Sequence, residues 1–237
     1  MTNKELVKDI IDFLKTPNLL GIEFSKSKKI GLVLKLWIIT LFTIVLLGQV
    51  INNLVDVPIP DLFDIKLKEL GVPLFVLLVT VIGPFLEELT FRLGLRYKPS
   101  YLLISFVFIA LYILASMSKI SESLVVSLAI LFTVIFLILV YFVSQKGEKS
   151  QMFYVTYYPY IFYGVAIVFG YVHIANFEDI TARILWLSPL IVLPQILLGL
   201  GMGYVRVRLG FWYGVLFHIL HNSVITFFLY SQGYFNI

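Results

Sequence analysis

Long apolar runs separated by short polar connections dominate the chain after residue 30. A helix needs roughly 20 mostly apolar residues to cross a bilayer. Seven runs reach or approach that length, at residues 30–50, 72–95, 101–117, 122–143, 157–176, 184–204 and 210–231. The run at 101–117 is short, and Gly83-Pro84 should kink the second run. The pattern predicts an all-α fold, a polytopic transmembrane helical bundle of about seven spans.

Residues 3–15 have the periodicity of an amphipathic helix, with lysines and aspartates on its polar face. Its apolar face comprises Leu6, Ile10, Phe13 and Leu14. Three lysines follow just before the first run: Lys26, Lys28 and Lys29. This favours a helix lying in the membrane interface, although an ordinary soluble N-terminal helix also fits. We expect an amphipathic, basic segment at 1–29 and a membrane-embedded domain at 30–237.

Composition agrees with a membrane protein. Hydrophobic residues make up 60% of the 237 and charged residues 14%, against about 25% charged in soluble domains. Such a chain has too little polar surface to cover a soluble core of this size. The chain contains no cysteine, which excludes disulfides, thiolate nucleophiles and cysteine-bound metals.

Lysines and arginines concentrate on one side of the predicted membrane. With the N-terminus inside, the inner segments hold about twelve: Lys4, Lys8, Lys15, Lys26, Lys28, Lys29, Arg96, Lys98, Lys146, Lys149, Arg206 and Arg208. The outer loops hold four: Lys66, Lys68, Lys119 and Arg183. The positive-inside rule predicts an integral multi-pass protein with a cytoplasmic N-terminus, and seven spans put the C-terminus outside.

Three ionisable residues fall within the second run: Glu87, Glu88 and Arg92. A charge at mid-bilayer costs about 3 kcal/mol on insertion scales, so such residues usually face the bundle interior and serve a function. Glu88 and Arg92 are four residues apart and can pair on one helical face, whereas Glu87 points about 100° away from Glu88. This predicts a structural Glu88–Arg92 pair and a freer Glu87 suited to general-base catalysis. A purely structural ion-pair cluster also fits.

Two later runs carry histidines. His173 lies near the end of the fifth run, and Phe169 is placed four residues earlier to wall its imidazole. In the last run His218 and Asn222 are four residues apart, so both can donate to one oxygen, as an oxyanion site requires. His221, about 60° from His218, could face a neighbouring helix. A core histidine and an interhelical hydrogen-bond cluster are the structural alternatives.

Together these residues could catalyse hydrolysis by an activated water molecule. Glu87 and His173 would deprotonate and orient the water, while His218 and Asn222 would hold the carbonyl oxygen as it gains charge. Glu87, His173 and His218 also resemble a zinc ligand set with an open position. The sequence leaves direct carboxylate catalysis and metal-assisted hydrolysis both open, with a divalent metal such as zinc as the one cofactor candidate.

Three strings resemble the motifs of one family, the CPBP family of CAAX-protease and bacteriocin-processing (Abi) membrane peptidases. EELTFR resembles its EExxxR motif, FGYVHIANF its FxxxH motif, and LLGLGMGYVRVRLGFWYGVLFHILHNS its last two spans, which end in HxxxN. The resemblance covers residues 80–97, 165–178 and 195–226. It implies a helical membrane fold with a polar cavity, and cleavage of peptide bonds within or next to the bilayer.

The resemblance also implies the residue roles. Glu87 would be the catalytic glutamate and His173 its partner in activating water, with His218 and Asn222 as the oxyanion site. Glu88, Arg92 and Phe169 would support them. Family descriptions include both metallopeptidase and glutamate-peptidase mechanisms.

One departure concerns the spacing of the motifs. In the family the second motif commonly follows about one span after the first, whereas here roughly 80 residues and two extra apolar runs intervene. An even number of inserted spans preserves the relative directions of the motif-bearing helices. We therefore expect an outer inserted pair at 101–143 and catalytic spans at about 72–95, 157–176 and 210–231.

These observations predict an intramembrane endopeptidase that hydrolyses a peptide bond of a membrane-associated protein or peptide. Its expected partners are the lipid bilayer and that substrate, and no nucleic acid. Two alternatives stay open. One is a non-catalytic membrane immunity or partner-binding protein on the same scaffold, and the other is a proton-coupled transporter in which Glu87 carries the proton.

Overall fold

The computed structural model describes residues 2–55, 67–117, 122–145, 147–177 and 180–233, and within them every regular element is helical. Six helical segments in these ranges are long and apolar enough to cross a membrane: Lys26–Leu54, Val72–Phe91, Glu122–Ser144, Tyr158–Asn176, Ala182–Arg208 and Phe211–Ser231. Pro99–Ala115 is apolar but shorter. The expected all-α bundle is confirmed, and the chain is an integral multi-pass membrane protein by the length and composition of its helices.

The helices follow the apolar runs closely. The first half contains α1 (Asn3–Lys15), α2 (Lys26–Val55), α4 (Val72–Leu77), the π-helix η1 (Leu78–Ile82), α5 (Gly83–Phe91), the 3₁₀-helix η2 (Leu93–Leu95) and α6 (Pro99–Met117). The second half contains α7 (Glu122–Gln145), α8 (Gly147–Thr156), α9 (Tyr158–Val172), the 3₁₀-helix η3 (His173–Asn176), α10 (Ala182–Ile191), α11 (Leu193–Arg208) and α12 (Phe211–Ser231). The helix α8 falls between two apolar runs, so their pattern did not predict it.

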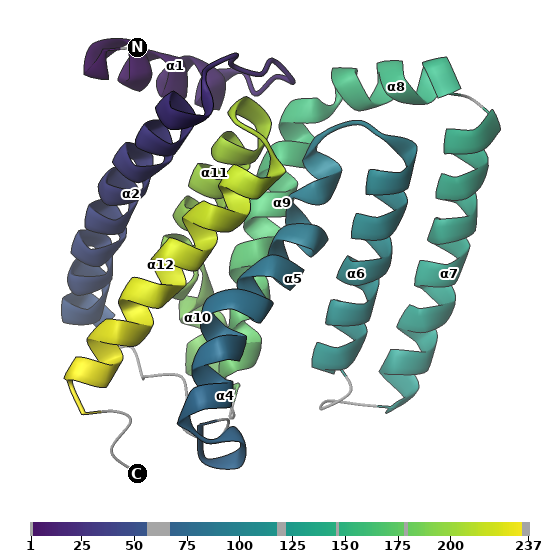
Figure 1. Ribbon diagram of the computed structural model, residues 1–237. Helices are drawn as coiled ribbons and strands as arrows, with labels where there is room; N and C mark the ends of the chain where they lie inside the picture. The colour runs from purple at the N-terminus through teal and green to yellow at the C-terminus, as the bar shows by residue number, and fades with distance from the viewer. Residues whose placement is uncertain (1, 56–66, 118–121, 146, 178–179, 234–237) are drawn as a thin grey trace.

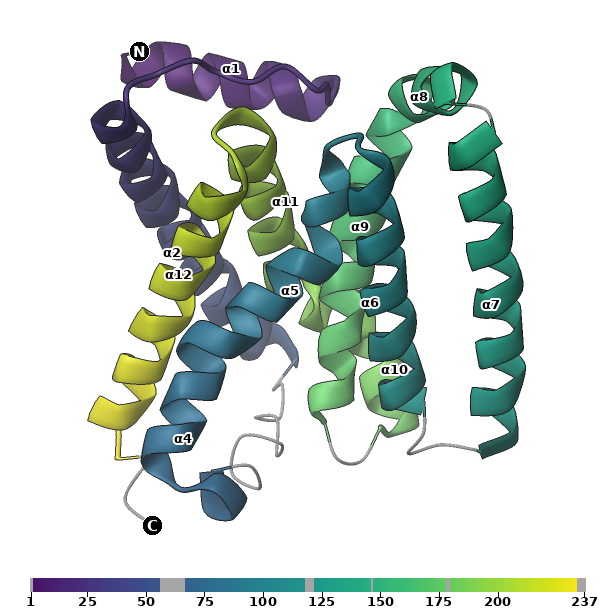
Figure 2. The same cartoon turned by 45° about the vertical axis from the view of Figure 1, so that its right-hand side comes forward.

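The centre of the bundle is formed by α11, which packs against α9, α12 and α2. The helix α5 packs between α12 and α6, while α7 lies at the edge of the molecule and contacts α6 and α8 (Figures 1 and 2). In these views α5 runs in the opposite direction to α9 and α12. Among the helices that carry the sequence motifs, α5 contacts both α9 and α12.

The N-terminal helix α1 lies across one end of the bundle (Figure 1). Its apolar face is covered by protein: Leu6 and Phe13 are buried in the main hydrophobic core, and Ile10 and Leu14 pack against that core. These four residues therefore contact the bundle, and the placement of α1 at the membrane interface stays a prediction. A hydrophobic stripe indicates that a helix face is removed from water, and either lipid or protein can bury it.

Polar contacts join α1 to α9 and α11. Asp9 forms an ion pair with Arg208 at 3.1 Å, and the Tyr204 hydroxyl donates a hydrogen bond to Asp9. The Tyr163 hydroxyl donates to the carbonyl oxygen of Leu14. These contacts fix the helix on the ends of α9 and α11.

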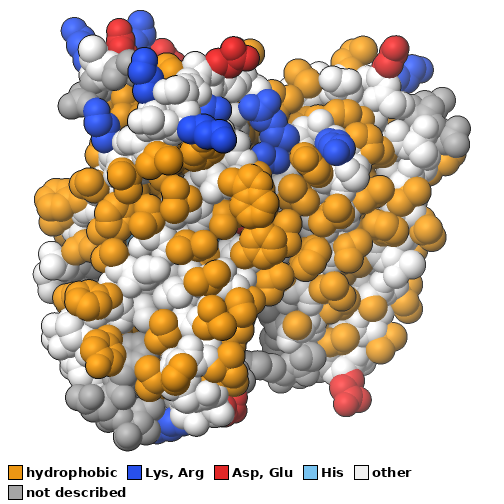
Figure 3. Space-filling view, viewed as in Figure 1, with side chains coloured by type: hydrophobic (Ala, Val, Ile, Leu, Met, Phe, Trp, Pro, Cys, Tyr) orange, Lys and Arg blue, Asp and Glu red, His pale blue; other side chains and the backbone are white. Residues whose placement is uncertain are grey.

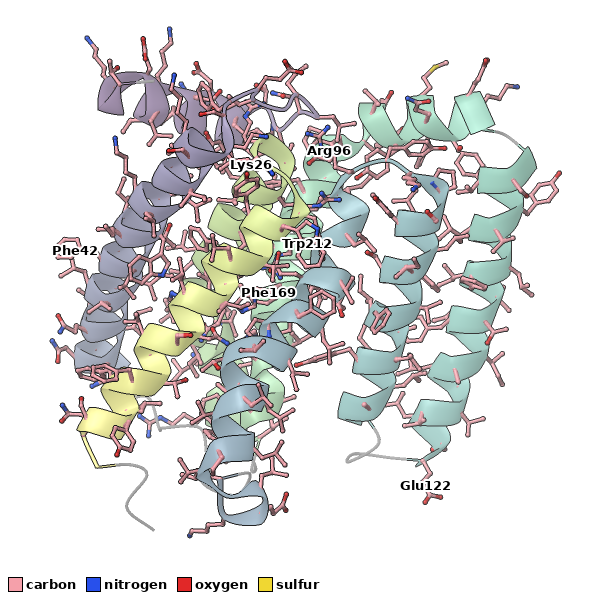
Figure 4. The ribbon with its side chains drawn as sticks, in the orientation of Figure 1. Lys26, Phe42, Arg96, Glu122, Phe169 and Trp212 are labelled. Atoms are coloured by element: carbon pink, nitrogen blue, oxygen red, sulfur yellow. The ribbon has the colours of Figure 1, made fainter. Side chains whose placement is uncertain are left out.

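The basic residues gather at the end of the molecule that carries α1, as the space-filling view shows (Figure 3). Lys26 and Arg96 lie towards this end and Glu122 lies at the other (Figure 4). Apolar side chains cover most of the surface between the two ends (Figure 3). Lys66, Lys119 and Lys146 of the charge count lie outside the described residues.

We predict that Phe13→Ala destabilises the protein. The Phe13 ring is fully buried and meets the rings of Phe162 and Tyr204 edge to face, at centroid distances of 5.0 and 5.3 Å. Removing such a ring should lower the free energy of unfolding by about 3–5 kcal/mol, measured by denaturation in detergent micelles. Val7→Ala is the control on the same helix, because Val7 is 48% exposed. Equal effects of the two substitutions would contradict the docking of α1.

Candidate active site

A cavity of about 480 Å³ lies between α4, η1, α5, α9, α11 and α12. It is lined by residues from every motif of the sequence analysis, including Glu87 of α5, His173 at the start of η3, and His218 and Asn222 of α12. The structure thus brings together the four residues predicted to be catalytic. Phe169, which also lines the cavity, lies in the middle of the bundle (Figure 4).

The most deeply buried charge at the site belongs to Glu88, whose side chain has no exposed surface. Its Oε1 atom lies 3.5 Å from Nε of Arg92, one turn later on the same helix, as the spacing predicted. The same oxygen lies 3.1 Å from Nδ1 of His218 on α12. The sequence did not indicate this second contact, which links α5 to α12. A Cβ at Gly214 would lie 3.1 Å from Glu88 Oε2, a tight contact, so glycine there leaves room for the carboxylate.

Glu87 differs from its neighbour in exposure. Its side chain is 24% exposed and opens into the cavity, whereas that of Glu88 is fully buried. The Oε2 atom of Glu87 lies 3.7 Å from Nε2 of His218, which is too far for a direct hydrogen bond. The imidazole of His218 therefore lies between two carboxylates, bonded to Glu88 and facing Glu87. This agrees with the expected division between a paired Glu88 and a freer Glu87.

Arg92 is held by a carboxylate and an aromatic ring. Its side chain is 1% exposed, and its guanidinium carbon lies 3.8 Å from the centroid of the Phe169 ring, a cation–π contact. The same ring meets His173 edge to face at 4.8 Å and lies 6.1 Å from the ring of His218. The expected wall for the imidazole of His173 is present, and it also supports Arg92 and His218.

The tautomer of His173 follows from its hydrogen bond. Nδ1 lies 2.7 Å from the backbone carbonyl oxygen of Phe169. A carbonyl oxygen can only accept, so Nδ1 carries a proton and the neutral ring keeps a lone pair on Nε2. His173 stands where α9 gives way to the 3₁₀ turn η3. An imidazole fixed in this way can accept a hydrogen bond from a water molecule in the cavity.

The helix leading to Glu87 has a π turn, at the point where the sequence predicted a kink. The N–H of Gly83 donates to the carbonyl of Leu78, five residues back. In that register the next donor would serve the carbonyl of Val79, but the next residue is Pro84, which has no N–H. Nδ2 of Asn222 supplies the missing donor at 2.9 Å from the Val79 oxygen.

Asn222 therefore has a structural contact that the sequence did not predict. Its amide has two N–H donors, of which one bonds Val79, so the other is the donor available to an oxyanion. Gly83 is required in the same turn, because a Cβ there would lie 2.9 Å from the carbonyl oxygen of Leu78. π turns of this kind occur frequently at functional sites.

The zinc ligand set of the sequence analysis is not assembled in this arrangement. Among the residues that the structure describes, no three His, Cys, Asp or Glu side chains are placed to hold a metal ion together. Glu87, His173 and His218 line one cavity, and Nδ1 of each histidine lies next to an oxygen atom, which leaves Nε2 as the ring atom that a metal would bind. The site thus contains suitable donors, but they are not grouped as a metal site.

The sequence patterns did not predict a functional role for several polar residues near the site. Gln195, His221, Asn176 and Thr226 line the cavity. Arg206 is buried and donates to the carbonyl oxygens of Arg92 and Leu93 at 2.9 and 3.2 Å, closing the end of α5. Polar residues within apolar runs are the signal that could have identified them, because such residues usually face the bundle interior.

No family model, curated protein or solved structure matches the chain.

We predict that Asn222→Ala lowers the free energy of unfolding by about 1–3 kcal/mol, because it leaves the part-buried Val79 carbonyl without this donor. In a Pro84→Ala background the loss should be smaller, since the N–H of an alanine can serve Val79 in the π register. Unfolding of the two single variants and the double variant in detergent measures this coupling. Asn53→Ala, at an exposed position of α2, is the control. Purely additive losses would show that Asn222 does not replace the missing donor.

Proposed function

We propose that the protein is an intramembrane endopeptidase that hydrolyses a peptide bond of a membrane-associated protein or peptide. The observation that carries the proposal is the convergence of Glu87, His173, His218 and Asn222, from three spans, on one cavity. Ionisable residues are rare in transmembrane helices and usually mark a functional site. The resemblance of the three sequence motifs to the CPBP family supports the same function.

In the proposed reaction Glu87 is the general base. Its carboxylate opens into the cavity, where it takes a proton from a water molecule as the water oxygen attacks the substrate carbonyl carbon. His173 orients that water through the lone pair on Nε2. The tetrahedral intermediate then breaks its C–N bond, and the proton on Glu87 passes to the leaving nitrogen. Two products result, one with a new carboxylate and one with a new amine.

His218 and Asn222 stabilise the oxyanion of the intermediate. Because Nδ1 of His218 binds Glu88, donation from Nε2 requires a ring with a proton on both nitrogens. The buried carboxylate of Glu88, 3.1 Å from Nδ1, balances the positive charge of that ring. Asn222 contributes the N–H that does not bond Val79. In this proposal Glu88 is a positioning residue, and Arg92 and Phe169 hold it and the two histidines in place.

We further propose that the end carrying α1 faces the cytoplasm. The basic residues gather at this end, as the positive-inside rule requires of the cytoplasmic side. The helix α12 ends on the opposite side (Figure 1), so in this proposal the end of α12 lies outside, as expected for the C-terminus. The partners in this proposal are the bilayer and the membrane-associated substrate, and no nucleic acid.

We predict that Glu87→Gln abolishes proteolysis while the protein stays folded in the membrane. Loss of a general base typically lowers the rate by about 10²–10⁴, and His173→Ala should have a similar effect. The measurement is mass spectrometry of new protein N-termini in cells that express either wild type or the variant. Glu122→Gln is the matched control, since Glu122 lies at the end of α7, away from the cavity (Figure 4).

An unchanged set of new N-termini in both variants would refute the peptidase. Glu87-dependent uptake of solutes into proteoliposomes, without any cleavage, would instead establish a transporter. A cellular phenotype that survives Glu87→Gln would favour a partner-binding protein.

We predict that cleavage survives removal of metal ions, because direct activation of water by Glu87 requires none. The purified protein in lipid nanodiscs would be dialysed against 1,10-phenanthroline and assayed on a substrate identified from the new N-termini. Turnover should stay within about twofold of that of the untreated protein. The loss of a catalytic group would lower turnover far more. Loss of turnover that is restored by added zinc would instead establish the Glu87, His173 and His218 ligand set.

A further inference from the structure

A second cavity, of about 360 Å³, lies between the inserted pair α6–α7 and the helices α5, α8 and α9. Its volume falls within the range of sites that bind small molecules. Among the described residues, none lines both this cavity and the one that contains Glu87. The ring of Phe91 in the second cavity contacts that of Phe169 in the first, at a centroid distance of 5.4 Å. The two cavities are thus adjacent but separate.

The lining of the second cavity offers almost nothing to a polar ligand. Five of its side chains carry a hydroxyl group, and each is already hydrogen-bonded within the protein: Thr90, Tyr97, Ser105, Ser150 and Tyr154. The other lining residues are apolar or glycine. A buried water needs two to four polar partners, so this cavity suits hydrocarbon better than water.

The cavity lies next to the bilayer. Leu139 of α7 lines one side of it and Val165 of α9 lines another. The helix α7 lies at the edge of the molecule, where its main contacts are with α6 and α8 (Figure 2). Ile138 and Tyr141 of α7 are 61% and 63% exposed, so lipid surrounds this helix. Acyl chains of the bilayer are therefore the hydrocarbon nearest to the cavity.

Two exposed lysines flank one end of the cavity. Lys98 follows Tyr97 in the chain and Lys149 precedes Ser150, and the hydroxyls of Tyr97 and Ser150 are bonded to each other at the cavity wall. The helix α8, which carries Lys149, lies at the same end of the molecule as α1 (Figure 1), where the basic residues gather. Glu148 is the one carboxylate on α8. Basic residues beside a pocket between membrane helices attract anionic lipid headgroups.

We propose that the second cavity binds one acyl chain of an anionic phospholipid, whose headgroup lies at Lys98 and Lys149. The chain fills a space that would destabilise the bundle if it were empty. It thereby joins α7 to α9. A helix of a partner protein is about 10 Å wide and would need a far larger space. The site requires no peptidase activity, so it stands apart from the proposed hydrolysis.

The headgroup is tested by native mass spectrometry of the full-length protein. The detergent micelles contain equal amounts of phosphatidylglycerol and phosphatidylcholine with the same acyl chains. Wild type should retain one phospholipid and bind phosphatidylglycerol about tenfold more tightly, as two lysines near the headgroup allow. Lys98→Gln combined with Lys149→Gln should remove this preference. Lys4→Gln combined with Lys8→Gln, at exposed positions of α1, is the matched control and should keep it.

The cavity itself is tested by filling it. Val165→Phe places a ring where the acyl chain would lie, so it should lower the retention of phospholipid about tenfold, because burial of several CH₂ groups is lost. Val134→Phe is the control, since Val134 of α7 is 48% exposed and does not line the cavity. If Val165→Phe does not fold, Leu139→Phe on the α7 side provides the same test.

Thermal unfolding of the same proteins identifies the variants that fold. Saturating phosphatidylglycerol should raise the melting temperature of wild type by about 5 °C and leave that of Val165→Phe almost unchanged. Three results would each overturn the proposal: retention of no phospholipid, equal retention of the two headgroups by wild type, and full retention by a folded cavity-filling variant. Dimers in place of bound lipid would assign the cavity to a second copy of the chain.

Discussion

The burial of the Glu88 carboxylate is the constraint on which the site depends. A charge without exposed surface inside an apolar bundle is tolerated only where partners surround it. Glu88 finds one partner on its own helix, Arg92, and one on α12, His218. Because Gly214 allows the contact, α5 and α12 come close enough for their polar side chains to meet in one cavity.

Phe169 extends this arrangement to a third helix. A flat guanidinium can stack on an aromatic face in a way that a lysine ammonium cannot, so Arg92 binds Glu88 along its edge and Phe169 with its face. The same ring contacts His173, which follows one turn later at the start of η3. The spacing of motif residues along each helix therefore has a physical reason, since it places Arg92 and two imidazoles around the ring of Phe169.

The sequence predicts most of the fold because length and hydropathy define a membrane helix almost completely. It also predicts the Glu88–Arg92 pair, whose partners share one helix. The contacts between helices depend on rotations and depths that one sequence does not encode in an obvious way. The bond from His218 to Glu88 and the bond from Asn222 to Val79 belong to this kind and required the structure. The burial of α1 was missed for a related reason, since an apolar face does not reveal what covers it.

The docking of α1 has a consequence for biosynthesis. The contact between Asp9 and Arg208 joins residues 199 positions apart, so α1 is synthesised long before its partner on α11. Until α11 enters the membrane, Phe13 and Leu6 lack the core that buries them in the finished protein. The helix α1 can thus complete its docking onto the bundle only after α11 has been made.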